Sequence, residues 1–282
     1  MNTVRALLAA IAVLAAACAS PDRGPSLAVG ATADPESTLL AQVYAAGLRN
    51  YGTAVRIETY ASADEALRAL DAGAVTVVPG FTGRFLQRFD PESTARSAAQ
   101  VYRAMLGSLP EGISASDYAV AAEDKPALAV TGATATAWAS RDLTALVRKC
   151  AGLTVGAVAG RATAPAVGDC TLPAPREFSS GPALFDALQA GAVTAAWTST
   201  ADTGIPGGVV VLVDRKPALI PAQNVVALYR RNEMGALQLR AANEIAGVLD
   251  TASLVGMLRD VQNGADPQGV AEQWLAANPL AD

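Results

Sequence analysis

An eight-residue phrase occurs twice in this chain, as ALDAGAVT at residues 69–76 and as ALQAGAVT at residues 187–194, with seven of the eight positions identical. Each copy predicts the last turn of a helix, a glycine stop and a strand of valine and small residues. Two such units far apart in the sequence predict two similar α/β lobes. Because ligands bind beyond the carboxyl ends of strands in open α/β sheets, two facing strand ends would make a cleft. The alternative is coincidence in a chain rich in Ala, Gly and Val.

Strand and helix patterns alternate along the rest of the chain, which predicts an α/β fold. Helix starts are marked by Asp-Pro pairs or by capping-box spacing, as at Asp34-Pro35 and from Ser62 to Glu65. Asp90-Pro91 predicts in the same way a helix that runs to about Leu106. A returning strand at 225–229 and three final helices complete the expected order of elements.

The N-terminus has the pattern of a bacterial lipoprotein signal. Arg5 precedes an apolar run, residues 6–17, that is too short to span a bilayer comfortably. Residues 14–18, Leu-Ala-Ala-Ala-Cys, resemble a lipobox, although the usual Leu three residues before the cysteine is Ala here. We therefore expect a signal peptide over 1–17, a lipid on Cys18 and a tether over 18–25. The alternative is an ordinary signal peptide with an incidental cysteine.

The chain has three cysteines, which is an odd number. If Cys18 carries a lipid, Cys150 and Cys170 remain as a pair, and an exported protein enters an oxidising compartment. A Cys150–Cys170 disulfide is therefore expected, with two buried thiols as the alternative.

Composition excludes several classes of function. The chain has no histidine, which excludes a Ser-His-Asp or Cys-His catalytic device and argues against an ordinary zinc site. There is no P-loop and no GxGxxG motif. We expect no enzyme, no metal and no cofactor. The net charge of −5 and the lack of a basic cluster argue against a nucleic-acid partner.

Several weak motifs follow one another in a fixed order over nearly the whole chain after the N-terminal signal. They are Val29-Gly30 with Glu36, the helix positions Leu40, Tyr44, Ala45 and Leu48, and the segments 69–84, 127–130, 185–191, 212–216 and 266–275. In this order they resemble the OpuAC/ProX group of substrate-binding proteins, which serve bacterial ABC importers of glycine betaine, choline, carnitine and related solutes.

This resemblance implies a type II periplasmic-binding-protein-like fold with two lobes. Two crossing segments, expected near 125–128 and 222–226, would form a hinge that closes on ligand. Lobe 1 would comprise 26–125 plus 226–282, and lobe 2 would comprise 126–225.

The resemblance also implies where ligand binds. The family holds a quaternary ammonium in a cage of tyrosines by cation–π attraction. This chain has other residues at the matching positions, namely Phe81, Pro126, Phe185 and Thr198, the last beside Trp197. The matching positions give as expected ligand-binding residues Ser37, Phe81, Thr82, Arg84, Pro126, Phe185, Trp197 and Thr198. For the three aromatic side chains, ordinary core packing is the alternative.

Arg84 replaces a threonine that helps to hold the carboxylate of the ligand in relatives. An arginine offers a bidentate fork to a carboxylate and places a positive charge beside any cation. We therefore expect a ligand with an anionic group, and we expect Phe81, Arg84, Phe185 and Trp197 to converge on one pocket. The alternative for Arg84 is a solvated helix face.

The expected function is capture of a small polar or zwitterionic solute for delivery to an ABC permease and ATPase complex. The protein would be a monomer, anchored by its lipid to the outer face of the bacterial cytoplasmic membrane. The alternative is a lipoprotein of the same fold that acts as a ligand sensor or an envelope scaffold and transports nothing.

The lipid anchor is testable by replacing its attachment residue. Cys18→Ser should leave a folded protein that no longer associates with membranes, because the acyl thioether cannot form. Membrane fractionation measures this. A Ser variant that partitions with membranes as the unmodified sequence does would contradict the lipoprotein assignment.

Overall fold

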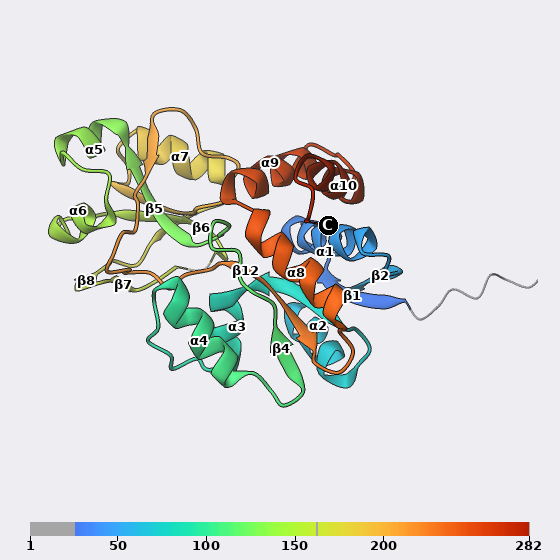
Figure 1. The fold of residues 1–282 in the computed structure, drawn as a ribbon. Coiled ribbons are helices and arrows are strands. Elements are labelled where there is room, and N and C mark those ends of the chain that lie inside the picture. Colours follow the sequence, from blue (N-terminus) through green and yellow to red (C-terminus); the bar gives the residue numbers. More distant parts are fainter. Residues whose placement is uncertain (1–25, 162, 282) are drawn as a thin grey trace, which may run out of the picture.

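The computed structural model describes residues 26–161 and 163–281, so the expected signal peptide and the whole expected tether, including Cys18, lie outside the described residues. The described strands form two five-stranded sheets, each at the centre of one lobe, and one two-stranded ribbon (Figure 1). The predicted two-lobed α/β fold is confirmed. Within the described ranges, no helix is both long and apolar enough to cross a membrane.

The first sheet has the strand order β2-β1-β3-β12-β4. Its strands are β1 (Leu27–Thr32), β2 (Val55–Tyr60), β3 (Val77–Phe81), β4 (Ile113–Ala115) and β12 (Val225–Arg230). Side chains alternate between the faces, so Val29 packs with the helices on one side and Ala28 with those on the other. Both faces are therefore buried.

Among the described residues, seven helices belong to the first lobe. One face of its sheet carries α1 (Pro35–Asn50), α8 (Ala236–Val248), α9 (Thr251–Gln262) and α10 (Pro267–Ala277), and the other carries α2 (Ala63–Ala72), α3 (Thr82–Phe89) and α4 (Ala98–Ser108). The C-terminal helices pack directly on α1, as Figure 1 shows. The end of the chain thus completes the lobe that its beginning starts.

The second sheet has the order β11-β5-β10-β6-β9. Its strands and helices are β5 (Pro126–Thr131), α5 (Gly132–Ala137), α6 (Leu143–Arg148), β6 (Val155–Val158), β9 (Arg176–Phe178), α7 (Gly181–Gln189), β10 (Ala195–Ser199) and β11 (Val209–Val211). Helices α5 and α6 cover one face and α7 covers the other. All five strands come from one continuous stretch of the chain.

A two-stranded ribbon of β7 (Ala166–Val167) and β8 (Cys170–Thr171) packs against the core beside α6. The structure has a disulfide between Cys150 and Cys170, which are 20 residues apart. In the chain-entropy account a loop of this size stabilises the folded state by about 3 kcal/mol. The bond ties the ribbon to the end of α6.

The repeated phrase forms the same structure in both lobes. Gly73 and Gly191 end α2 and α7 with φ of 77° and 74°, a left-handed conformation that glycine adopts without strain. The strand that follows, β3 or β10, is parallel to one neighbour and antiparallel to the other. The two strands therefore occupy equivalent central positions, and the prediction of two similar lobes is confirmed.

The predicted helix beginning at Asp90 is wrong. Helix α3 occupies residues 82–89 and ends at Asp90, residues 91 and 92 form a turn, and α4 begins only after Ser97. Ser97 and Gln100 form the capping box of α4. Proline is common both at the first turn of a helix and just after a helix ends, and Pro91 takes the second of these positions.

Two crossing segments join the lobes. The first directly precedes β5 and the second directly precedes β12, and they pair with each other through a β-bridge between Glu123 and Asn224. The second segment is held on lobe 1 by Thr82, whose backbone N–H donates to the Asn224 carbonyl at 2.9 Å and whose hydroxyl accepts the Asn224 N–H at 3.1 Å. The start of α3 packs closely against the second segment, since a Cβ atom at Gly83 would lie 2.5 Å from the Ala222 carbonyl oxygen. The hinge therefore contacts the start of α3 directly.

The first crossing segment is held to both lobes by neighbouring charges. Asp124 accepts from Arg84 of lobe 1 at 2.7 Å, and Lys125 donates to Asp214 of lobe 2 at 3.0 Å. The Lys125 and Asp214 side chains are only 9% and 4% exposed. Asp214 also accepts the backbone N–H groups of Leu219 and Ile220.

The buried Lys125–Asp214 pair should stabilise the hinge end of lobe 2. Lys125→Met leaves a buried carboxylate without a counter-charge and should lower the free energy of unfolding by about 3 kcal/mol. Adding Asp214→Asn should recover part of this loss, because asparagine is neutral and its amide oxygen still accepts one of the two backbone N–H groups. Urea denaturation compares the variants, and equal stability of the single and double variants would contradict the assignment.

Candidate ligand-binding cleft

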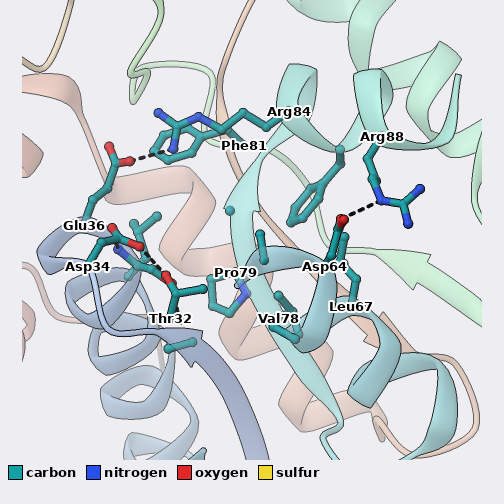
Figure 2. Close-up of a pocket in the computed structure, with 17 residues that line it drawn as sticks. Thr32, Asp34, Glu36, Asp64, Leu67, Val78, Pro79, Phe81, Arg84 and Arg88 are labelled. Carbon is teal, nitrogen blue, oxygen red and sulfur yellow. Dashed lines mark hydrogen bonds and ion pairs between the residues drawn. The ribbon is translucent and has the colours of Figure 1, made fainter. Parts of the chain in front are cut away.

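A pocket of about 240 Å³ lies in lobe 1 at the carboxyl ends of β1 and β3. The starts of α1, α2 and α3 surround it, so the pocket has helix N-termini on three sides (Figure 2). Leu67, Val78 and Phe85 contribute to an apolar lining. The rim is charged, with an Arg84–Glu36 pair on one side and an Arg88–Asp64 pair on the other.

Arg84 on α3 has three partners. Its guanidinium nitrogens donate to Glu36 and to Asp124, each at 2.7 Å, and its guanidinium carbon lies 4.3 Å from the centre of the Phe81 ring. The Arg84 backbone N–H donates to the side-chain oxygen of Gln223 in the second crossing segment. Arg84 thus joins α1, β3 and both crossing segments, although its side chain is 52% exposed.

Glu36 lies in an environment that disfavours its charge. Burial raises the pKa of its carboxyl group and the nearby Asp124 carboxylate raises it further, to about 7, in spite of the Arg84 ion pair that lowers it. The same two carboxylates raise the pKa of the Arg84 guanidinium, against the opposing effect of burial. The Glu36 carboxyl group therefore titrates at a higher pH than an ordinary glutamate does.

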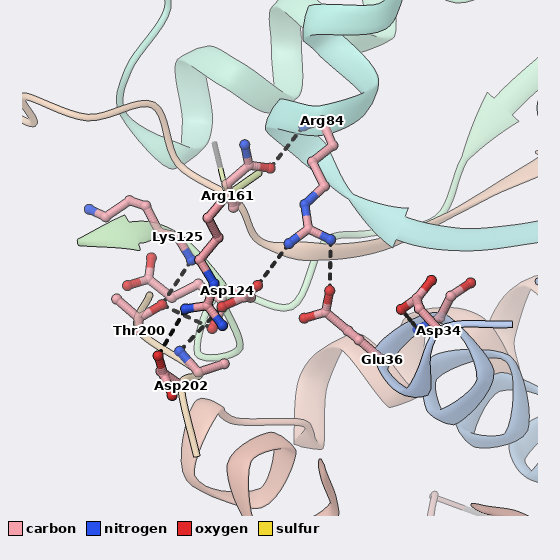
Figure 3. Close-up of polar contacts among 12 residues, drawn as sticks. Asp34, Glu36, Arg84, Asp124, Lys125, Arg161, Thr200 and Asp202 are labelled. Carbon is pink, nitrogen blue, oxygen red and sulfur yellow. Dashed lines mark hydrogen bonds and ion pairs between the residues drawn. The ribbon is translucent and has the colours of Figure 1, made fainter. Parts of the chain in front are cut away.

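The polar cluster continues into lobe 2. Asp124 also accepts the backbone N–H of Ala201, and the next residue, Asp202, pairs with Arg161 at 2.9 Å (Figure 3). Burial would raise the pKa of Asp202, but hydrogen bonds from Thr198, Gly204 and Arg161 outweigh it, and the pKa is lowered. Charged groups of both lobes thus lie on either side of the first crossing segment.

The expected convergence of four side chains on one pocket is not found. Phe81 and Arg84 lie together, but Phe185 and Trp197 are each 2% exposed and pack on opposite faces of the second sheet. Phe185 contacts the α7 side of this sheet, whereas Trp197 belongs to the core under α5 and α6. The sheet itself separates the two rings, and core packing accounts for both.

The other four expected ligand-binding residues lie in separate places. Ser37 lines the lobe 1 pocket, where its hydroxyl accepts the Thr32 N–H. Thr82 is fully buried against Asn224, and Thr198 donates to Asp202 at 2.7 Å. Pro126 begins β5 beside the hinge and lines two other cavities. Contact of any of these residues with ligand remains a prediction.

Two acidic residues of the cluster were not among the expected site residues. Glu36 lies 48 positions from Arg84 in the sequence and Asp124 lies 40 positions from it. Two local signals exist. Glu36 is one of the motif positions that carry the family resemblance, and Glu123-Asp124-Lys125 is a charged run directly before segment 127–130. Such a run is also typical of an exposed loop, so it does not identify a site.

A family profile described as the substrate-binding domain of the ABC-type glycine betaine transport system matches residues 25–277. The chain belongs to the OpuAC family. The match spans both lobes and the hinge. The OpuAC family comprises substrate-binding transport proteins and is not a class of enzymes. No curated protein sequence matches the chain significantly.

Solved structures show the same fold at low sequence identity. Apo YehZ from Escherichia coli is 19% identical with a TM-score of 0.70, and the match covers 90% of this chain and 99% of YehZ. A glycine betaine/carnitine/choline ABC transporter protein is 15% identical with a TM-score of 0.72 over 90% and 98% of the two chains. Lactococcal OpuAC in a closed complex with glycine betaine is 12% identical with a TM-score of 0.50 over 90% and 96%.

The environment of Glu36 predicts a pH-dependent stability. Between the usual carboxyl pKa of 4.5 and about 7, the folded protein holds a proton that the unfolded chain releases, so stability falls as pH rises through this window. The contribution is roughly 2 to 3 kcal/mol between pH 5 and pH 8. Glu36→Gln should remove it.

Urea denaturation at several pH values measures this contribution as the difference between the native sequence and Glu36→Gln. Glu111→Gln, at an exposed turn, is the control for loss of a carboxylate. A Glu36→Gln variant whose stability follows pH in parallel with the native sequence would show that Glu36 titrates normally.

Proposed function

We propose that the protein is the lipid-anchored substrate-binding component of an ABC importer on the outer face of the bacterial cytoplasmic membrane. It captures a small polar or zwitterionic solute between its lobes and delivers it to the permease and ATPase complex. The observation that carries this proposal is the OpuAC match, which extends over both lobes and includes the hinge. The chain acts as a monomer, since one copy supplies both sides of the cleft.

The hinge geometry supports capture by closure. In the part of the chain that the structure describes, two crossing segments connect the sheets, and they contact each other at the Glu123–Asn224 bridge. Domain closure needs few residues to absorb the change in backbone angles, and a pair of short crossings provides this. Arg84, which lines the lobe 1 pocket, contacts both crossing segments, so closure of the hinge would act on the pocket through this residue.

The pocket lining supports a solute with an apolar body and both signs of charge, such as glycine betaine or carnitine. The apolar lining fits methyl or methylene groups. The rim carries two exposed arginines, each paired with a carboxylate, so the charged groups of a zwitterion would exchange partners with these ion pairs. The glycine betaine and choline named for the solved relatives are natural first candidates.

A thermal-shift screen of the exported Cys18→Ser protein tests this proposal. Glycine betaine, carnitine, choline, proline and small organic acids are the probes, and calorimetry follows each hit. A true ligand present at 100 times its Kd should stabilise the protein by roughly 2.7 kcal/mol. Deletion of the gene should then reduce cellular uptake of that solute.

The outcomes separate transport from the alternative role. Stabilisation by a solute together with reduced uptake supports the proposal. Binding with unchanged uptake would assign the protein to ligand sensing instead. A screen in which no small solute stabilises the protein would favour an envelope scaffold.

A further inference from the structure

The Arg84 guanidinium occupies a position with the features of a binding site for an organic cation. An aromatic ring face lies beneath it at 4.3 Å, and two carboxylates accept from it at 2.7 Å each (Figure 3). A cation over an aromatic face is attracted to the ring, and charge-assisted hydrogen bonds are stronger than neutral ones. These are the interactions by which a protein recognises a guanidinium or alkylammonium ligand.

The partners of Arg84 are more buried than Arg84 itself. The side chains of Glu36 and Asp124 are 18% and 12% exposed, Phe81 is 2% exposed, and the Arg84 side chain is 52% exposed. Two carboxylates and an aromatic ring therefore form a largely buried site, and the exposed Arg84 side chain covers it from the solvent side. Figure 2 shows the guanidinium lying across the Phe81 ring at the edge of the pocket.

We propose that Arg84 is the specificity-determining residue of the lobe 1 pocket, because its own guanidinium fills the cation position formed by Phe81, Glu36 and Asp124. A cationic solute group is thereby excluded from this position. The ligand places an uncharged group next to Arg84, because two carboxylates already occupy the guanidinium, and any cationic group it carries binds elsewhere in the cleft. This inference deepens the proposed function and rests on it.

Removing the guanidinium should create a site for a free cation. Arg84→Ala leaves two carboxylates and a ring face without their cation, and methylguanidinium has the size and charge of the group that is lost. Methylguanidinium chloride should bind Arg84→Ala at least about tenfold more tightly than it binds the native sequence. Tetramethylammonium chloride, the second probe, tests whether the ring face and charge suffice without directed hydrogen bonds.

Arg88 on the same helix provides a matched control. Its side chain is 53% exposed against 52% for Arg84, and it pairs with one carboxylate, Asp64, at 2.6 Å. Arg88→Ala removes an equally exposed guanidinium from the same pocket but leaves only a single exposed carboxylate behind. It should gain no affinity for methylguanidinium.

The experiment is calorimetric titration and thermal unfolding of the exported protein with each probe, against sodium chloride at equal ionic strength. Arg84→Gln repeats the test in case the alanine variant is unstable, and the Arg84→Ala/Glu36→Gln double variant should lose the gained affinity. Equal binding by Arg84→Ala and the native sequence, or an equal gain by Arg88→Ala, would overturn the proposal. Proton uptake by Glu36 without probe binding would overturn it as well.

These results are distinguishable from failure of the proposed function. The probes report on the Arg84 position whether or not a natural solute is known. If Arg84→Ala binds methylguanidinium while no solute binds the native sequence, the proposed function is rejected, but the proposal that Arg84 fills the cation position is supported. If a solute binds the native sequence and the variant gains nothing, only the assignment of Arg84 fails.

Discussion

The first crossing segment carries two adjacent side chains of opposite charge that bind to different lobes. Asp124 pairs with Arg84 on the first lobe, and Lys125 pairs with Asp214 on the second. Because the residues are consecutive, the point at which the chain passes from one lobe to the other is fixed within one peptide unit. The second segment is fixed by the side-chain amide of Asn224, which donates to the carbonyl groups of Ala119, Val120 and Ala122.

This arrangement places the charges of the cleft next to the hinge. Arg84 is bound to the first crossing segment through Asp124 and to the second through Gln223. A ligand that competes for Arg84 therefore also changes the contacts of the hinge. Reorganisation of ion pairs at a domain boundary is one of the ways in which binding favours one domain arrangement over another.

Local sequence signals predicted most of the fold. The caps at Asp34, Ser62 and Asp266 and the repeated Ala-Gly phrase mark helix ends by backbone chemistry that acts within a few residues. The positions of Phe185 and Trp197 could not be read in the same way. Each is close in sequence to the repeated strand, but the face on which a side chain lies depends on its register and on which helices cover that face.

Partners far apart in the sequence were the hardest to predict. Nothing near Arg84 indicates that Glu36 and Asp124 accept from it, because those contacts depend on three elements meeting at one sheet edge. We predicted from the sequence that Arg84 is free to bind a ligand carboxylate, because its partners within the chain could not be identified. The structure shows that two carboxylates of the chain already occupy that arginine.

The position of β12 has a consequence for the order in which the lobes can form. In the first sheet β12 lies between β3 and β4, which do not pair with each other, and it is made after every strand of the second sheet. As the chain grows, the second lobe has all its strands while the first still lacks an internal one. The first lobe can complete its sheet only after the chain has returned, and cutting the chain between the lobes would leave β3 and β4 with unpaired edges that invite aggregation.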